Sequence, residues 1–396
     1  MWFLPAAFSM VALLTIALAL YLARWAPEEL PWTISQEAVQ SILEILATSL
    51  LTVSVFALST LVSALSSASA STSPRAVPLI VGDRGAQTSI SVFIGAFLFS
   101  ILAILGLSAG IYSSASRLLL FSVTLAVVAL VIAALIRWIA QISDIGRVGH
   151  TIERVEKATA SALGRLVDHP FYDCRILEGQ PKGKAVCADR LGYVQHFDAA
   201  RLQRLAEEHG LQIAVTALPG AYVSPVRPLM KVSGTFDDEL AVELIGAFVV
   251  DGSRSFDNDP RFGLSVLAEI ADRALSPAVN DPGTAIDVLG RLTRLLSDWA
   301  PRNPKEHPDN PRVAVPALSA KDLIEDAFRP IARDGATLIE VVLRLLYSLE
   351  VIAQLNPFLR DDALAAARDA AERAKRVLEA PTDIQALSDA MRFTTS

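Results

Sequence analysis

The stretch "LLLFSVTLAVVALVIAALIRWIAQI", residues 118–142, decides the architecture of this chain. It contains no charged residue before Arg137, and its length matches the ~20 helical residues that cross about 30 Å of hydrocarbon. The segment therefore predicts a membrane-spanning helix. Three more apolar runs of this kind precede it, at residues 3–22, 42–65 and 90–112. The sequence thus predicts a four-span transmembrane domain over residues 1–143.

The composition changes sharply after the last apolar run. Only 19% of the 396 residues are charged, against about 25% in ordinary soluble domains, and the mean hydropathy is +0.42. Residues 1–150 contain equal numbers of basic and acidic side chains, so the net charge of −7 belongs to the rest of the chain. An acidic soluble part is unsuited to nucleic acid as the main partner. We expect a membrane part followed by a soluble part.

The distribution of Lys and Arg between the loops predicts an orientation. On one side the loops carry only Arg24, next to three glutamates, and Arg117. The basic residues on the other side are Arg75, Arg84, Arg147, Arg154 and Lys157. Because cytoplasmic loops carry the excess of basic residues, both termini and the soluble part are predicted to be cytoplasmic, in a bacterial inner (plasma) membrane. Cys174 and Cys187 form no CxxC pair, which agrees with a reducing compartment.

The second apolar run carries a line of hydroxyl groups at helical spacing, formed by Thr48, Thr52, Ser59, Ser63 and Ser66. Hydroxyl groups in a spanning helix either bond to a neighbouring helix or line a water-filled path, and the sequence leaves both interpretations open. No ionisable side chain lies near the middle of any span. Ion-coupled transporters usually need one there, so a transporter is disfavoured.

Residues 144–170 predict a helical connector with a heptad seam. Its apolar positions alternate at intervals of three and four residues, at Ile145, Val148, Ile152, Val155, Thr159, Ala162 and Leu166. Such a seam is typical of a coiled coil that joins several copies of a chain. The alternative is that the seam packs against the soluble part of its own chain.

The soluble part divides by pattern into four segments. Residues 171–235 predict a small β-rich module, and residues 236–300 a helical region that begins with a helix over 237–250. This region continues as a helix hairpin, in which Asp281 is the N-cap and Pro282 the first residue of the second helix. Residues 301–318 contain five prolines and predict an irregular loop, and residues 319–396 predict a C-terminal helical region. The fold class is therefore membrane α-helical followed by cytoplasmic α+β.

Several motifs in this order carry a resemblance to a known family. They are "GDRG" at 82–85, "GYVQ" at 192–195, "PGAYV" at 219–223, and "DPRFGL…IADRALSPAVNDPGTAIDVL" within 259–289. Together they resemble the bacterial family of predicted membrane proteins known as domain of unknown function 2254. The resemblance implies a multi-pass N-terminal region and a soluble C-terminal part, and it supplies no catalytic residues. The structural signature residues are Asp259, Pro260, Ser276, Pro277, Asn280, Asp281 and Pro282.

The sequence contains no complete motif of the common enzyme classes or metal sites. "GQPKGK" at 179–184 is one residue short of a P-loop and lacks the hydroxyl residue after Lys184. No GxSxG occurs, and the five histidines have no metal-ligand spacing. The acidic residues around Asp257 do not follow the EF-hand pattern. We expect no enzyme activity, no cofactor and no metal site.

Two functions remain. The first is an oligomeric inner-membrane protein that conducts ions through a path lined by the hydroxyl groups, with the soluble part as vestibule or sensor. The second is a membrane-anchored interaction or sensor scaffold without a pore. Both imply the lipid bilayer as a partner, and the first implies further copies of the chain and ions.

Overall fold

A computed structural model describes residues 35–394, apart from 82–83, 110–111, 113, 146 and 304. Of the first 34 residues it describes only positions 6, 7, 9, 10, 13, 14, 17 and 21. The chain divides into two compact units, residues 1–151 and residues 152–396. Each unit is described here by itself.

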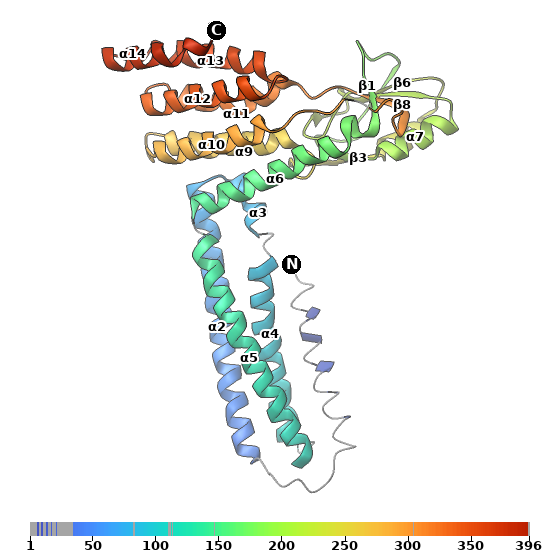
Figure 1. The fold of residues 1–396 in the computed structure, drawn as a ribbon. Coiled ribbons are helices and arrows are strands. Elements are labelled where there is room, and N and C mark those ends of the chain that lie inside the picture. The colour runs from blue at the N-terminus through green and yellow to red at the C-terminus, as the bar shows by residue number, and fades with distance from the viewer. Residues whose placement is uncertain are drawn as a thin grey trace. The chain divides into compact units, whose positions relative to one another are not determined.

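The described part of the first unit contains three long helices, α2 (Gln36–Ser71), α4 (Arg84–Ser108) and α5 (Ser114–Ile145), which lie side by side (Figure 1). Each contains a segment long and apolar enough to cross a membrane: Gln36–Ser67, Gln87–Ser108 and Arg117–Ile142. These segments correspond to three of the four predicted spans. Most of the first predicted span, residues 3–22, lies outside the described residues, so four spans are not established. A short 3₁₀ turn, η1 (Pro74–Ala76), and α3 (Val77–Val81) follow α2.

Small residues allow these helices to approach each other closely. Ala57 on α2 and Ala96 on α4 are buried in the same apolar cluster as Phe93 and Trp138. Gly106 on α4 makes room for a local contact. A Cβ atom there would come within 2.6 Å of the Tyr112 ring, so the absent side chain makes room for that ring.

The predicted connector forms α6 (Val148–Asp168). Its seam residues Ile152, Val155, Thr159 and Ala162 are at most 1% exposed within the single chain, while Val148 and Leu166 are half-buried. The side chain of Ile145 lies outside the described residues. Thr159 fits against Gly263, where a Cβ would collide with its hydroxyl, and Trp299 donates through Nε1 to the carbonyl of Leu163 (3.1 Å). In this chain the four central seam positions therefore pack against their own soluble unit, which leaves them no free surface for a coiled coil between copies.

Two small sheets form the β-rich part of the second unit. The five-stranded sheet has the order β1-β8-β4-β6-β2, in which β1, β8 and β4 are parallel neighbours and the remaining pairs are antiparallel. The three-stranded antiparallel sheet has the order β5-β3-β7. The strand bounds are β1 Cys174–Ile176, β2 Lys184–Cys187, β3 Gly192–Phe197, β4 Gln212–Val215, β5 Tyr222–Val223, β6 Pro228–Ser233, β7 Phe248–Asp251 and β8 Asn310–Val315. Helix α7 (Ala199–Glu208), capped by Asp198, covers the first sheet next to β8.

Two local predictions for this part were wrong. The helix expected over 237–250 ends early as α8 (Asp238–Ile245), and the chain then enters β7, which pairs with β3. The loop expected over 301–318 contains β8, which lies between β1 and β4. Its prolines flank the strand, except for Pro311 at the second position, and Val313, Ala314 and Val315 are buried. The β-rich part thus recruits strands from beyond residues 171–235.

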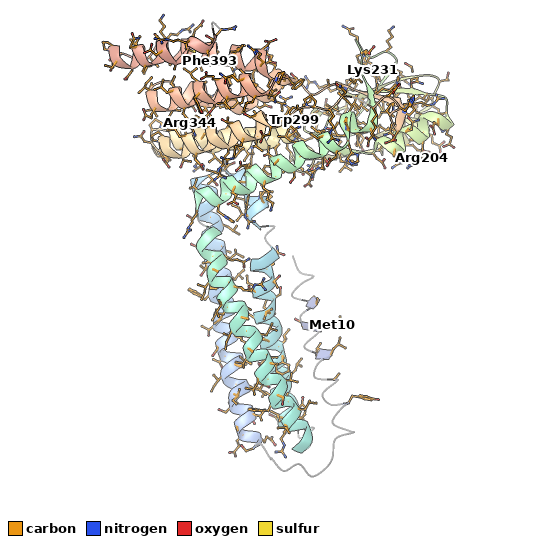
Figure 2. All side chains as sticks on the ribbon, viewed as in Figure 1. Met10, Arg204, Lys231, Trp299, Arg344 and Phe393 are labelled. Atoms are coloured by element: carbon orange, nitrogen blue, oxygen red, sulfur yellow. The ribbon has the colours of Figure 1, made fainter. Side chains whose placement is uncertain are left out.

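The remaining helices form a bundle in which α9 packs against α10 and α11, α12 packs against α10 and α13, and α11 packs against α13 (Figure 1). Their bounds are α9 Pro260–Leu275, α10 Pro282–Ser297, α11 Ala320–Asp334, α12 Ile339–Leu355, α13 Arg360–Lys375 and α14 Pro381–Ala390. Asn356, at the end of α12, is buried and donates through Nδ2 to the carbonyls of Leu296 and Trp299. It therefore fastens α12 to the end of α10, near Trp299 (Figure 2).

The position of the α6 seam leads to a test by charge insertion. Ile152→Asp should destabilise the soluble unit by several kcal/mol, because it places an unpaired charge in a closed interior. Thermal unfolding of the detergent-solubilised chain, followed by circular dichroism, measures the loss. Glu153→Lys, on the exposed side of α6, is the matched control and should leave the melting temperature almost unchanged. A stable Ile152→Asp protein with fewer subunits per particle would instead assign the seam to contacts between copies.

Candidate functional site

The five hydroxyl residues of α2 share one exposed side of the helix. Thr48, Thr52, Ser59, Ser63 and Ser66 are all exposed in the described chain. Successive residues of an α-helix are about 100° apart, which places this line of residues opposite the buried side formed by Leu43, Leu50 and Ala57. We call it the α2 hydroxyl stripe. It does not pack against α4 or α5.

The surroundings of the stripe are strongly apolar. Large exposed side chains flank it on both sides, namely Ile45, Leu51, Val55, Phe56, Leu58 and Val62. Two of the hydroxyls bond within their own helix, since Thr48 Oγ1 donates to the carbonyl of Glu44 (2.9 Å) and Thr52 Oγ1 to that of Thr48 (3.0 Å). The stripe is therefore a narrow polar line on an apolar face, where it can meet water, lipid or another helix.

In the soluble unit, the signature residue Asp259 is the centre of a buried ionic cluster. Its carboxylate is 4% exposed and accepts two hydrogen bonds from Arg254, from Nε at 2.7 Å and from Nη2 at 3.0 Å. It also accepts from the N–H of Phe262 (3.1 Å), which makes it the N-cap of α9, with Pro260 in the first turn. Burial raises the pKa of Asp259, while the Arg254 guanidinium and the helix N–H oppose that rise.

The same cluster joins segments that are far apart in the sequence. Gly220, at φ 89°, lies so close to the Asp259 carboxylate that a Cβ atom would collide with it. Gln195 donates to the carbonyl of Ser253, and Asn258 Nδ2 donates to the carbonyl of Gln195 (3.4 Å). The motifs "GYVQ", "PGAYV" and "DPRFGL" therefore meet at one place.

A cleft of about 360 Å³ opens beside this cluster. Arg254 and Arg261 line it, together with Thr216, Gly220 and Ser319. The two guanidiniums already face carboxylates, because Arg261 binds Asp322 and Asp326, both at 2.6 Å. The cleft is thus charge-balanced by its own residues.

The other signature residues form the exposed turn between α9 and α10. Ser276 is the C-cap of α9, Pro277 and Asn280 are exposed, and Asn280 has a left-handed φ of 51°. Asp281 Oδ1 accepts from the N–H of Thr284 (3.1 Å), and Pro282 is in the first turn of α10, as the sequence predicts. Hydrogen bonds from the Thr284 hydroxyl and N–H lower the pKa of Asp281.

A polar groove of about 540 Å³ runs between α9 and α11 and contains a perturbed carboxyl group. Asp272 Oδ1 is buried without a hydrogen-bond partner, and Arg333 Nη2 lies 3.4 Å from Oδ2. Burial, followed by the negative charges of Asp334 and Glu269, raises the pKa of Asp272 to about 7, although Arg333 opposes the rise. Asp272 therefore titrates near neutral pH.

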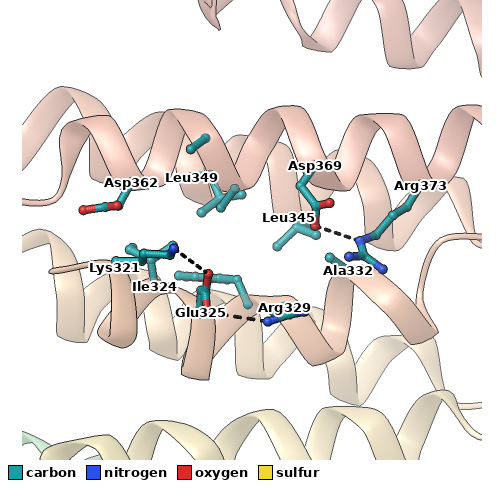
Figure 3. Close-up of a pocket in the computed structure, with 13 residues that line it drawn as sticks. Lys321, Ile324, Glu325, Arg329, Ala332, Leu345, Leu349, Asp362, Asp369 and Arg373 are labelled. Carbon is teal, nitrogen blue, oxygen red and sulfur yellow. Dashed lines mark hydrogen bonds and ion pairs between the residues drawn. The ribbon is translucent and has the colours of Figure 1, made fainter. Parts of the chain in front are cut away.

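A third depression, of about 270 Å³, lies between α11, α12 and α13 (Figure 3). Its floor is apolar, with Ile324, Leu345 and Leu349, and its rim is charged. The rim charges pair along their own helices: Glu325 with Lys321 and Arg329, and Asp369 with Arg373 (Figure 3). Within the part of the chain that the structure describes, no group of three or more His, Cys, Asp or Glu side chains could hold a metal ion.

Comparison with known proteins identifies the family of the chain. The family model of predicted membrane proteins, DUF2254, matches residues 1–351. The chain belongs to this family. Curated relatives include uncharacterised proteins of Mycobacterium bovis and Mycobacterium tuberculosis, each 27% identical over 181 residues, which is 43% of this chain. The chain spans only 35% of the length of those relatives. No solved structure matches.

The sequence of this DUF2254 protein did not predict the roles of some residues at these sites. Pro219-Gly220 signals a turn, but nothing nearby shows that Gly220 contacts a residue 39 positions later. Arg254 stands five residues before Asp259, and this short spacing was the available clue to their pairing. Asp272 looks like an ordinary helix residue, because its burial depends on α11.

Two capping aspartates provide a matched pair of substitutions. Asp281→Ala should cost ~1 kcal/mol, the usual value for an exposed N-cap. Asp259→Asn should cost about 3–5 kcal/mol, because it leaves the Arg254 guanidinium buried without its counter-charge. Thermal or urea unfolding of the full chain measures both losses, and equal losses would show that the ion pair adds nothing beyond the cap.

Asp272 leads to a prediction about pH. Its folded-state pKa of about 7 lies above the ordinary value of 3.8, so the folded state binds the proton more tightly than the unfolded state. Its contribution to stability is full below about pH 4 and is lost as the pH rises through 7. Asp272→Asn should therefore melt higher than the wild type at pH 8, by several degrees, and this gain should shrink toward pH 5. Asp334→Asn would relieve the repulsion only in part. A gain independent of pH would contradict the assignment.

Proposed function

We propose that this chain is a subunit of an oligomeric, multi-pass protein of the bacterial inner membrane, in which α2 hydroxyl stripes from several copies line an ion-conducting path. The observation that carries the proposal is the direction of the stripe. It points away from α4 and α5, so its hydroxyl groups are presented to something outside the described part of the subunit.

The chemistry of the stripe suits a wet path between helices. Serine and threonine hydroxyls both donate and accept hydrogen bonds and replace part of an ion's hydration shell. Small side chains also allow helices to approach closely. The flanking side chains, such as Val55 and Phe56, would seal neighbouring copies against each other on either side of the stripe.

The proposed orientation follows the distribution of basic residues. Arg75, Arg84 and the basic residues after Arg147 belong to the cytoplasmic side, so the soluble unit and both termini are placed in the cytoplasm. The soluble unit is then a sensor or vestibule. We assign it no reaction, no cofactor and no nucleic-acid partner.

A second candidate is a membrane-anchored interaction or sensor protein without a pore. The hydrogen bonds of Thr48 and Thr52 to their own helix favour it, because hydroxyls satisfied in this way need neither water nor a second copy. The burial of the α6 seam also favours it, since that seam is not available to join copies.

Electrical measurement separates the two functions. Wild-type protein in planar bilayers should pass ions, and Ser59→Leu/Ser63→Leu should pass far fewer at equal incorporation, because hydrocarbon in the path favours dewetting. Ser122→Leu is the matched control: Ser122 is an exposed serine on α5 whose hydroxyl bonds to the carbonyl of Leu118, and its replacement should leave the conductance unchanged. A correctly assembled wild-type protein that stays silent across voltage, tension and pH would favour the scaffold.

A further inference from the structure

A cavity of about 260 Å³ in the soluble unit lies where the end of α6 meets β3 and α7. Its apolar wall includes Leu166 and the rings of Tyr172 and Phe197, whose centroids are 4.9 Å apart. The Tyr172 hydroxyl is turned into the protein, where burial, followed by the charge of Asp259, raises its pKa well above the usual range. Leu166 and Tyr172 thus give the cavity an apolar side.

The polar groups at this cavity differ in whether they already have partners. The two carboxylates are occupied: Asp173 binds His169 Nδ1 (2.7 Å) and Lys305 (2.9 Å), and Asp198 caps α7 by accepting from the N–H of Arg201 (2.9 Å). Arg165, in contrast, has no ion pair or side-chain hydrogen bond among the described residues. His196 is exposed and stacks on Phe197.

The hydrogen bond to Asp173 determines which ring nitrogen of His169 carries the proton. Although partial burial raises the pKa of Asp173, hydrogen bonds from Lys305 and His169 bring it below its ordinary value, so the carboxylate is ionised. An ionised acceptor holds the proton on Nδ1 of His169, which leaves Nε2 as the other polar atom of the ring.

The backbone that shapes the wall is unusual. Phe171, Tyr172 and Asp173 all have left-handed φ values, of 53°, 56° and 56°. Three consecutive left-handed residues other than glycine are strained, and they persist only where the surroundings fix them. This turn presents the Tyr172 ring to the cavity and the Asp173 carboxylate to His169.

We propose that this cavity binds a small aromatic carboxylate, with the ring against Tyr172 and Leu166 and the carboxylate on Arg165. The apolar wall with Leu166 and Tyr172 selects the body of the ligand, since an aromatic ligand packs favourably on apolar and aromatic side chains. The unpaired guanidinium selects the charge, because Arg binds carboxylates in a bidentate manner. The three larger clefts described above do not offer this combination, since their lining arginines face carboxylates of the protein itself, as Arg254, Arg261 and Arg373 do.

Benzoate is the probe for the first measurement. Isothermal titration of the full-length protein in detergent should show saturable binding of benzoate. Benzylamine has the same ring and the opposite charge, so it should not bind. Arg165→Gln should weaken benzoate binding about tenfold or more, as expected for loss of a charge-assisted pair.

Two further variants test whether benzoate binds in this cavity and whether Arg165 is specifically required. Arg204→Gln removes an exposed arginine of α7 that does not line the cavity (Figure 2), and it should bind benzoate as the wild type does. Ala199→Trp fills the cavity without changing its charge and should abolish binding, with retention of the fold checked by circular dichroism. Absence of saturable benzoate binding, equal binding by Arg165→Gln, or equal binding of benzylamine would each overturn the proposal. None of these results depends on whether the membrane unit conducts ions.

Discussion

The soluble unit depends on one buried carboxylate. Asp259 starts α9, holds Arg254 and occupies the space that a side chain at Gly220 would need. Because a buried charge is tolerated only when its partners are in place, these three contacts must form together. They fix the loop before β5 and the segment after β7 against the first turn of the helical bundle. The sheets and the bundle are therefore locked to each other through this residue.

Local signals in the sequence predicted much of the helical structure. Apolar runs of the right length matched three long helices, and Asp281 is an N-cap as its position predicts. These features depend on residues within one or two turns of each other. The strand β8 was missed because the surrounding prolines indicate a loop, and only its parallel neighbours β1 and β4 make it a strand.

Features that depend on contacts between residues far apart in the chain could not be predicted from the sequence. The heptad pattern of α6 showed that one side of that helix is buried, but a period of 3.5 residues does not identify what covers it. In the structure Gly263 and Trp299 supply the cover. Likewise, the line of hydroxyls on α2 followed from spacing, whereas its outward direction depends on which side meets α4. The left-handed turn at 171–173 has no glycine or asparagine to announce it.

Arginines that stabilise the fold of the soluble unit are paired with carboxylates, whereas the arginine of the candidate binding site is not. Asp259, Asp322 and Asp326 each neutralise an arginine that would otherwise face a cleft, and the desolvation of such groups is offset only when both partners are present. Arg165, in contrast, has no carboxylate partner among the described residues. It lies next to an apolar cavity whose two carboxylates already bind other groups of the protein. A guanidinium in that position interacts more strongly with an incoming anion than one that must first give up a partner.

In the membrane unit, one side of α2 packs against the neighbouring helices, and the side that carries the hydroxyl stripe does not. Leu43, Leu50 and Ala57 use one side of α2 to hold the three helices together, and no hydroxyl of the stripe is needed there. Thr48 and Thr52 bond to their own backbone and so can face hydrocarbon at little cost. A stripe kept for packing against the other two described spanning helices would have to face α4 or α5, and it does not. Its function therefore concerns what lies outside these three helices.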